Sequence, residues 1–245
     1  MADNNGIRAA LEIRTVSKAF GRKPVLRGIS LTAAGGESIA MIGRNGAGKT
    51  TLLSIVSGAA SPDKGDVIIN GCSLSKRSER LDARRHVGFL PHDLFIYEDL
   101  TASENLEYFG RLWGAGGKDL KAEIERILGD VGLHGTAKKA VRAFSRGMQQ
   151  RLAIARLILT DPAVWIMDEP FTGLDAAGRQ WLYSLLRRET ETGRLILFST
   201  HSEEDVLNGA GRILVIKNGR LHSDAGVTGG DSETVKGLFS AGMGN

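Results

Sequence analysis

The sequence predicts an α/β fold with a mostly parallel core sheet, an N-terminal antiparallel β subdomain and an inserted α-helical subdomain. Three observations predict this fold. Short strands that are apolar throughout alternate with helical stretches, which is the pattern of a parallel sheet buried on both faces. Two other strand-like segments suit a half-exposed sheet, and a block in the middle of the chain has helical periodicity without strands. We expect residues 1–245 to form a single domain.

The antiparallel part is predicted from two segments in the first third of the chain. Residues 11–16 alternate apolar and polar side chains, as a strand with one face in solvent does. Residues 66–70 fit the same kind of strand and lead into a glycine turn.

The parallel part is predicted from three apolar runs, at residues 38–42, 163–167 and 195–199. Each run has the length of a strand and is followed by polar residues. Helical stretches separate the runs, so the strands are expected to be connected by crossovers and to lie parallel.

The helical insertion is expected at about residues 93–160. Residues 101–104 have the spacing of a capping box, and apolar side chains then recur at helical intervals as far as Trp113. A second amphipathic stretch covers residues 120–128 and a third covers residues 149–160.

The C-terminal tail, at about residues 223–245, is rich in Gly and Ser before a short apolar patch at Val235, Leu238 and Phe239. This patch either caps the core or meets a partner, and the sequence leaves both readings open.

Composition places the chain among globular proteins of ordinary size. It has 245 residues, of which 42% are hydrophobic, and a net charge of +4. No run approaches the roughly 18 apolar residues that a membrane span needs, so we expect a cytoplasmic protein that is not exported. Cys72 is the only cysteine, which excludes an intrachain disulfide and indicates an unremarkable residue beside a turn. A basic cluster over residues 76–85 is expected to be a solvated helix face rather than a nucleic-acid or lipid site.

A phosphate-binding loop is predicted directly after the first apolar run. Residues 43–50, GRNGAGKT, match G-x-x-x-x-G-K-[ST] and precede a helical stretch, which is the context the motif requires. Its backbone N–H groups and the helix N-terminus would hold phosphate oxygens, Lys49 would reach the β- and γ-phosphates, and Thr50 would bind Mg²⁺. The residues expected to contact ATP here are Gly43, Asn45, Gly46, Ala47, Gly48, Lys49, Thr50 and Thr51.

Further catalytic candidates follow the other two apolar runs. Asp168 and Glu169 end the run at 163–167, and His201 stands just after the run at 195–199. Parallel strands deliver such residues to one crevice at their carboxyl ends. Asp168 is suited to hold Mg²⁺, Glu169 to act as general base toward water, and His201 to contact the γ-phosphate and keep that water in register.

These residues, together with residues 144–151, FSRGMQQR, identify a resemblance to the ATP-binding subunits of ABC transporters that covers roughly residues 10–222. The segment 144–151 resembles the signature motif of that family. The resemblance implies an ABC-type ATPase domain of the P-loop class that binds two ATP molecules across a dimer, with Ser145 and Gly147 reaching the γ-phosphate held by the other subunit. It also implies that Asp175 belongs to the D-loop and that Phe20 stacks on adenine.

Two departures from the family pattern carry expectations of their own. Arg146 and Met148 replace the common Gly and Gln of the signature, which we expect to affect the rate rather than the reaction. His92 stands where the family has a glutamine that senses Mg²⁺ and links to the membrane subunit. Protonated His92 would repel the cation, so activity should fall toward acidic pH more steeply than in His92→Gln.

Within the family, residues 93–113 look like those of exporters, and residues 144–150 with 168–175 are similar to haem-exporter ATPases of cytochrome c maturation. The resemblance implies a second ATPase subunit, expected to be another copy of this chain, and permease subunits in the cell membrane, whose inner face this chain would bind. Exporters of drugs, lipids or polysaccharides remain alternatives. A soluble ATPase acting on ribosomes or DNA would normally carry two ATPase halves or a coiled-coil insertion, and a P-loop kinase would leave the signature segment unexplained. Nucleic acid is not an expected partner.

Overall fold

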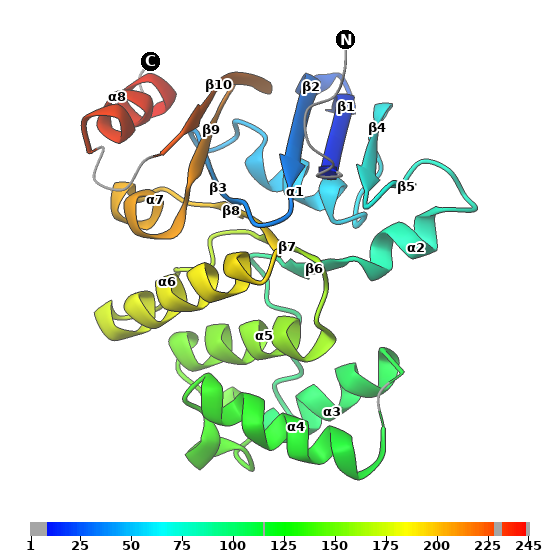
Figure 1. Ribbon diagram of the computed structural model, residues 1–245, viewed down its shortest axis with the longest axis vertical. Coiled ribbons are helices and arrows are strands. Elements are labelled where there is room, and N and C mark those ends of the chain that lie inside the picture. The colour runs from blue at the N-terminus through cyan, green and yellow to red at the C-terminus, as the bar shows by residue number, and fades with distance from the viewer. Residues whose placement is uncertain (1–8, 115, 228–231, 244–245) are drawn as a thin grey trace.

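The computed structural model describes residues 9–114, 116–227 and 232–243, and its first layer is a four-stranded antiparallel sheet (Figure 1). The strand order is β2 (Lys23–Ala34), β1 (Ala9–Phe20), β4 (Lys64–Ile69) and β5 (Cys72–Ser73). The predicted strands 11–16 and 66–70 lie mainly within β1 and β4. The strand β2 is not among the predicted strands. Its residues Ile29, Leu31 and Ala33 do alternate with polar residues, but Pro24 and Gly28 interrupt the strand pattern in its first half.

The second layer is a six-stranded sheet that is parallel except at one edge. Its order is β10 (Arg220–Gly226), β9 (Arg212–Lys217), β3 (Ser38–Ile42), β8 (Leu195–Ser199), β7 (Val164–Met167) and β6 (Val87–Leu90). Only β10 runs antiparallel, against β9. The turn between them is Asn218-Gly219, with both residues at positive φ, which is the preferred chemistry of a two-residue hairpin. The predicted α/β fold with a mostly parallel sheet is confirmed.

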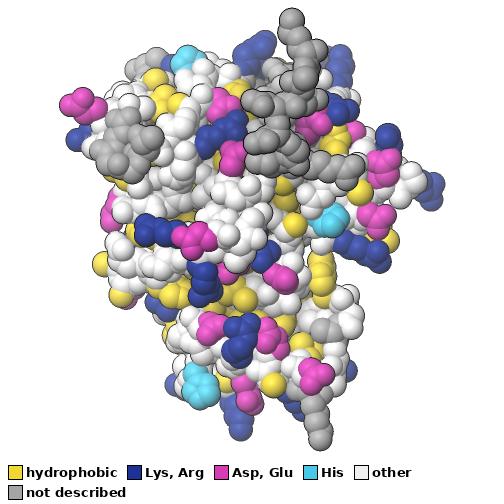
Figure 2. Space-filling model, viewed as in Figure 1, with side chains coloured by type: hydrophobic (Ala, Val, Ile, Leu, Met, Phe, Trp, Pro, Cys, Tyr) yellow, Lys and Arg dark blue, Asp and Glu magenta, His cyan; other side chains and the backbone are white. Residues whose placement is uncertain are grey.

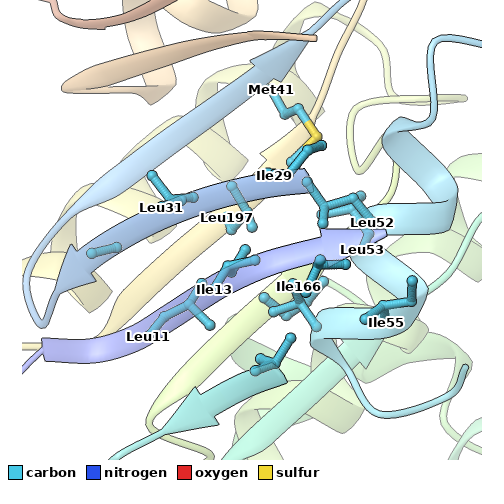
Figure 3. Close-up of a cluster of buried hydrophobic side chains, with 14 of the residues drawn as sticks. Leu11, Ile13, Ile29, Leu31, Met41, Leu52, Leu53, Ile55, Ile166 and Leu197 are labelled. Atoms are coloured by element: carbon cyan, nitrogen blue, oxygen red, sulfur yellow. The ribbon is translucent and has the colours of Figure 1, made fainter. Parts of the chain in front are cut away.

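The two faces of the parallel sheet belong to different cores, because successive side chains of a strand point in opposite directions. Ile166 and Leu197 point toward the antiparallel sheet and toward Leu52 and Leu53 of α1 (Lys49–Val56) (Figure 3). The helix α1 is therefore enclosed between the two sheets, and its first turn is held rigidly at the end of β3.

The opposite face of the parallel sheet is covered by helices (Figure 1). Trp165, Met167 and Phe198 pack there with residues of α5 (Arg146–Thr160), α6 (Ala176–Glu191), α7 (Glu203–Gly209) and α8 (Ser232–Met243). Val235 and Phe239 of α8 are buried in this cluster. The C-terminal patch therefore caps the core, which decides between the two readings that the sequence left open.

The helical block lies at the end of the molecule opposite to the antiparallel sheet (Figure 1). It comprises α3 (Ala102–Leu112), α4 (Gly117–Asp130), two short 3₁₀ turns (His134–Thr136 and Val141–Ala143) and α5. The helix α5 belongs to both units: Leu152 and Ala155 pack with α3 and α4, whereas Ile154 and Leu157 pack against the sheet. A rigid helix thus connects the start of α5 to the centre of the molecule.

The surface carries interspersed acidic and basic side chains on the face seen in Figure 2. The basic residues of 76–85, partly on α2 (Arg80–Arg85), are all exposed, as expected for a solvated face. Within the described residues, no helix is long and apolar enough to cross a bilayer.

Candidate nucleotide-binding site

The phosphate-binding loop connects the end of β3 at Ile42 to Lys49, the first residue of α1. Gly43, Gly46 and Gly48 have φ values of 153°, 79° and 108°, which disfavour residues with a side chain. A Cβ at Gly43 would collide with the carbonyl oxygen of Ile216, and one at Gly48 would lie 2.7 Å from Leu26 Cδ2. Gly43 and Gly48 are therefore required by both conformation and space, whereas Gly46 is required by its conformation alone, because a Cβ there would meet no atom within 4 Å. The three glycines let the loop wrap over the N-terminus of α1.

Lys49 is buried within this loop. Its Nζ donates to the Gly43 carbonyl oxygen at 2.6 Å and to that of Arg44 at 3.4 Å. Burial lowers the pKa of Lys49, although the nearby carboxylates of Glu169 and Asp168 oppose the shift by favouring the charged form. The ammonium group thus lies between the loop and the acidic strand end, where it can neutralise anionic ligand oxygens.

Asp168 and Glu169 follow β7, and Ser199 at the end of β8 holds both of them. The Ser199 hydroxyl donates to Asp168 Oδ1 at 2.5 Å and accepts from the Glu169 backbone N–H at 2.9 Å. The backbone of Glu169 lies in the left-handed region, with φ of 53°, which a residue with a side chain rarely adopts. Ser199 is absent from the predicted site residues. The only signal for it is a hydroxyl ending an apolar strand next to the strand that carries the acids.

His201 lies beside Glu169. Its Nε2 is 3.0 Å from Glu169 Oε1, and both side chains are about one third exposed, at 36% and 31%. The two residues come from neighbouring parallel strands, β8 and β7, so the sheet register sets their separation. An acid and an imidazole in contact at the edge of a cavity are suited to orient and deprotonate a water molecule.

A cavity of about 450 Å³ brings most of the predicted residues together. Its lining is Phe20, Lys23, Val25, Asn45, Gly46, Gly48, Lys49, Thr50, Thr51, Glu169 and His201. Phe20 is 59% exposed, so its ring face is available for stacking. Lys23 and Val25 are not among the predicted residues, because they belong to β2.

Seven predicted residues do not line this cavity. Gly43 and Ala47 of the phosphate-binding loop and Asp168 after β7 are buried, and the other four are Ser145, Gly147, Asp175 and His92. Ser145 is exposed and caps α5, accepting from the Met148 backbone N–H at 3.3 Å. Gly147 packs against the loop before α6, where a Cβ would lie 2.8 Å from the Gly173 carbonyl oxygen. Asp175 caps α6 by accepting from the Gly178 N–H at 2.7 Å, and the exposed His92 accepts from Arg146 through its backbone carbonyl at 3.1 Å.

The predicted metal ligands Thr50 and Asp168 suit Mg²⁺, which also binds phosphate and water, better than a metal ion whose ligands all come from the protein. No group of three or more His, Cys, Asp or Glu residues that could hold a metal occurs in the described ranges. Thr50 is exposed at the start of α1, and the buried Asp168 follows β7. One hydroxyl and one carboxylate suit Mg²⁺, which completes its shell with phosphate oxygens and water.

A phosphate-binding loop on a parallel sheet, with an acid pair and a histidine on neighbouring strand ends, defines a P-loop ATPase. The chain belongs to the ABC transporter family: the family model described as "ABC transporter" matches residues 26–172. It is accordingly an ATP-binding, ATP-hydrolysing domain.

Curated relatives resemble the chain over most of its length. The linearmycin resistance ATP-binding protein LnrL of Bacillus subtilis is 33% identical over 211 residues, covering 86% of this chain and 67% of that protein. The SkfA peptide export ATP-binding protein SkfE of Bacillus subtilis is 33% identical, covering 87% and 88%. The Nod factor export ATP-binding protein I of Paraburkholderia xenovorans is 38% identical, covering 86% and 69%.

Solved structures agree in fold. An ATP-binding subunit of an ABC transporter superposes with a TM-score of 0.82 at 28% identity, covering 95% of each chain. The ATP-binding cassette MJ0796, in a dimeric post-hydrolysis state bound to ADP and Pi, has a TM-score of 0.81 at 26% identity, covering 89% of this chain and 99% of that one.

Proposed function

We propose that this chain is the ATP-hydrolysing subunit of an ABC exporter and works as a dimer of ATPase subunits on a separate membrane permease. The observation that carries the proposal is the division of the predicted site. Phe20, the phosphate-binding loop, Glu169 and His201 share one cavity, whereas the signature residue Ser145 is exposed elsewhere on the chain. A site divided in this way is completed by a second subunit.

Each residue has a proposed role in ATP hydrolysis. Phe20 stacks on adenine, the loop from Gly43 to Thr51 binds the phosphates, and Lys49 neutralises the γ-phosphate. Thr50 and Asp168 would hold Mg²⁺, which shields the charge of the phosphates when bound. Glu169 accepts a proton from the attacking water, and His201 keeps Glu169 and the γ-phosphate in register.

The remaining predicted residues act between subunits in this proposal. Ser145 and Gly147 of one subunit contact the γ-phosphate bound by the other, with Asp175 nearby at the subunit boundary. The dimeric state of MJ0796, a structural neighbour, supports this arrangement. His92, at the junction of the core and the helical block of about 93–160, is proposed to sense nucleotide and signal to the permease.

A groove between α2, β6, α3 and α5 supports the permease as a partner. The cavity here measures about 410 Å³ and is lined by Phe89, Phe109, Trp113, Arg84 and Arg156 among others, with no carboxylate. Arg156 packs 4.7 Å from the Phe109 ring centroid, and burial lowers its pKa to about 10. The Arg156 guanidinium donates to the backbone carbonyl oxygens of Phe95 at 3.1 Å and Phe89 at 3.4 Å, and no ion pair found among the described residues neutralises its charge. We propose that a permease helix with apolar residues and one carboxylate occupies this groove.

Trp113→Ala tests the groove, because Trp113 is 52% exposed and its removal should not disturb folding. We expect co-purification of the permease to fall about tenfold, as for the loss of an aromatic anchor, with ATP binding retained. Tyr108→Ala, a change of an exposed aromatic residue on α3, the helix that Trp113 caps, lies outside the groove lining and is the control. Equal recovery of the permease with both variants would place its docking site elsewhere.

For the cargo, we propose only the direction of its transport. The relatives described above are named for linearmycin resistance, SkfA peptide export and Nod factor export, which favours export from the cytoplasmic face of the membrane. Haem export for cytochrome c maturation remains a prediction from the segments 144–150 and 168–175, and none of those relatives is named for haem.

Glu169→Gln tests the function and identifies the partner together. Removing the general base should abolish hydrolysis while ATP still binds, which traps the ATP-bound dimer. Tagged in its host and extracted in mild detergent with ATP, this variant should co-purify with multi-span membrane proteins, and their identity would assign the cargo. Recovery of ribosomal or DNA-repair proteins alone would contradict the transporter proposal.

A further inference from the structure

Asp205 is a buried carboxylate outside the predicted site. It lies on α7 and is 2% exposed. Thr200 Oγ1 donates to its Oδ2 at 2.6 Å, while Arg179 Nη1 and the Tyr183 hydroxyl donate to its Oδ1 at 2.6 Å and 2.8 Å. A carboxylate is retained at such a position only when its charge is compensated, and here one cation and two hydroxyls compensate it.

The three donors come from two elements that both lead to the nucleotide site. Thr200 directly precedes His201 at the end of β8, and its hydroxyl also accepts from the Ser202 backbone N–H at 3.1 Å. Arg179 and Tyr183 lie one turn apart on α6, the helix that begins after Asp175. Asp205 thus fixes the strand end that carries His201 to the first half of α6.

A small cavity of about 190 Å³ is shared by this cluster and the catalytic pair. Its lining includes Glu169 and His201 as well as Arg179, Thr200 and Asp205. The cluster is therefore adjacent to the reacting groups without lining the larger nucleotide cavity.

The Asp205 cluster is connected through α6 to α5, the helix whose first turn belongs to the signature segment 144–151. Gly147 at the start of α5 packs against Gly173, and Gln150 Nε2 donates to the Pro170 carbonyl at 2.8 Å. The loop between these contacts ends at the Asp175 cap of α6. Packed contacts therefore run from the start of α5 through α6 to Asp205, and from there to Thr200 and His201.

We propose that Asp205 is a positioning residue for ATP hydrolysis, which fixes His201 against Glu169 through Thr200 and links this geometry to α6 through Arg179. The inference rests on the proposed roles of Glu169 and His201. Burial, together with the hydrogen bond to Asp205, raises the pKa of Tyr183, so its hydroxyl stays a donor to the carboxylate at physiological pH.

Asp205→Asn tests this role, because the amide keeps the volume but presents an NH₂ group in place of one acceptor oxygen. We expect kcat for ATP hydrolysis to fall about tenfold or more, with KM for ATP changed less than about twofold, because the phosphate-binding loop is untouched. Thr200→Val removes only the hydroxyl and should reproduce the effect if Asp205→Asn does not fold. Glu204→Gln makes the same charge change at the exposed neighbour on α7 and should leave kcat unchanged.

A double-mutant cycle with His201→Ala distinguishes positioning from a general loss of structure. Rates are measured with radiolabelled ATP under single-turnover conditions, with Glu169→Gln assayed alongside. If Asp205 acts through His201, Asp205→Asn or Thr200→Val should have no further effect in the His201→Ala background. A full additional loss there, or an unchanged kcat in the single variants, would overturn the proposal. Unimpaired hydrolysis by Glu169→Gln would instead overturn the proposed function.

Discussion

At the residue scale, Ser199 organises the acidic end of the sheet. One hydroxyl orients the buried carboxylate of Asp168 and also anchors the backbone of Glu169, whose φ of 53° is unfavourable for a residue with a side chain. The hydrogen bond from the Glu169 N–H to Ser199, on the neighbouring strand, supports this backbone conformation, so the position of the proposed general base depends on a residue from another part of the chain.

Ser199→Ala should therefore impair catalysis more than the removal of a single hydroxyl group suggests. The change leaves Asp168 and the Glu169 N–H without their shared partner, at a cost of about 1–3 kcal/mol. We expect kcat to fall at least about tenfold and the melting temperature to drop by a few degrees. Steady-state ATPase assays and calorimetry measure both, and Ser184→Ala, at an exposed hydroxyl on α6, is the control. Normal kcat in Ser199→Ala would show that the acids hold their places without Ser199.

Lys49 is a buried cation whose burial costs stability, in return for its proposed role in binding phosphate. Because burial lowers its pKa, the folded protein holds this proton less tightly than the unfolded chain does. The resulting penalty is present below the folded pKa and fades as pH rises toward the unfolded value of 10.5.

Lys49→Met should raise the melting temperature of the nucleotide-free protein at pH 7 by about 2–4 °C, while ATP binding is lost. This gain in melting temperature should shrink toward pH 10, because Lys49 of the folded parent protein, whose pKa is lowered, loses its proton there and no longer buries a charge. Calorimetry over a pH series measures it, with Lys64→Met as the control at an exposed lysine. A gain that is constant with pH would mean that packing, not charge burial, causes it.

At the element scale, three neighbouring strands of the six-stranded sheet each deliver one part of the site. The carboxyl ends of β3, β7 and β8 carry the phosphate-binding loop, the acid pair and His201, and their parallel register brings these parts to one edge. The hairpin ends of the antiparallel sheet have a different function: β1 and β2 contribute Phe20, Lys23 and Val25 to the wall of the cavity.

Asp66 should make the hairpin of β4 and β5 sensitive to acid. Its burial opposes ionisation, but hydrogen bonds from Ser73, Ser75 and the Val67 N–H outweigh it and lower its pKa below 3.8. The carboxylate therefore stabilises the fold fully above pH 3.8, and this contribution is lost as pH falls through the lowered value.

Asp66→Asn should destabilise the protein at neutral pH and flatten the fall of stability below about pH 4. Urea unfolding at several pH values checks this, with the exposed Asp82→Asn on α2 as the matched change. Identical pH profiles of the parent protein and Asp66→Asn would contradict the assigned role.

At the scale of the whole molecule, the position of α5, whose first turn belongs to the signature segment 144–151, supports the proposed site shared between two subunits. The helix α5 packs on the parallel sheet, yet it starts at the exposed Ser145, outside the cavity that holds Lys49 and Glu169. ATP can therefore drive dimerisation only if ATP-bound subunits associate more tightly than nucleotide-free subunits do.

Glu169→Gln with Mg²⁺ and ATP should elute at twice the 26.3 kDa mass of one chain, and without ATP as the single chain. Adding Ser145→Glu places a negative charge opposite the γ-phosphate and should abolish the ATP-dependent shift. Ser78→Glu, at an exposed position near α2, should leave the shift intact. Light scattering after size exclusion gives the masses, and an undiminished dimer with Ser145→Glu would place the interface elsewhere.

The sequence by itself determined the parts that depend on local pattern. Apolar runs predict β3, β7 and β8, and the residues that follow these runs predict the phosphate-binding loop, Asp168, Glu169 and His201. These signals are strong because a buried strand must be apolar throughout, and because few loops other than a glycine-rich one can wrap a phosphate. The hairpin of β9 and β10 is absent from the predicted strands, although its apolar run and the turn Asn218-Gly219 are local signals of the same kind.

Only the tertiary structure decided which distant residues meet. Ser199 holds Asp168 and Glu169, and Asp205 joins Thr200 to α6, although neither contact has a local signature. The apolar patch of α8 is visible in the sequence, but only the structure shows that it covers the core. Each depends on sheet register and helix packing, which are set by pairing between segments far apart in the chain. A single polar residue gives no sign of the partner that it will meet, whereas a strand shows its burial in its own sequence.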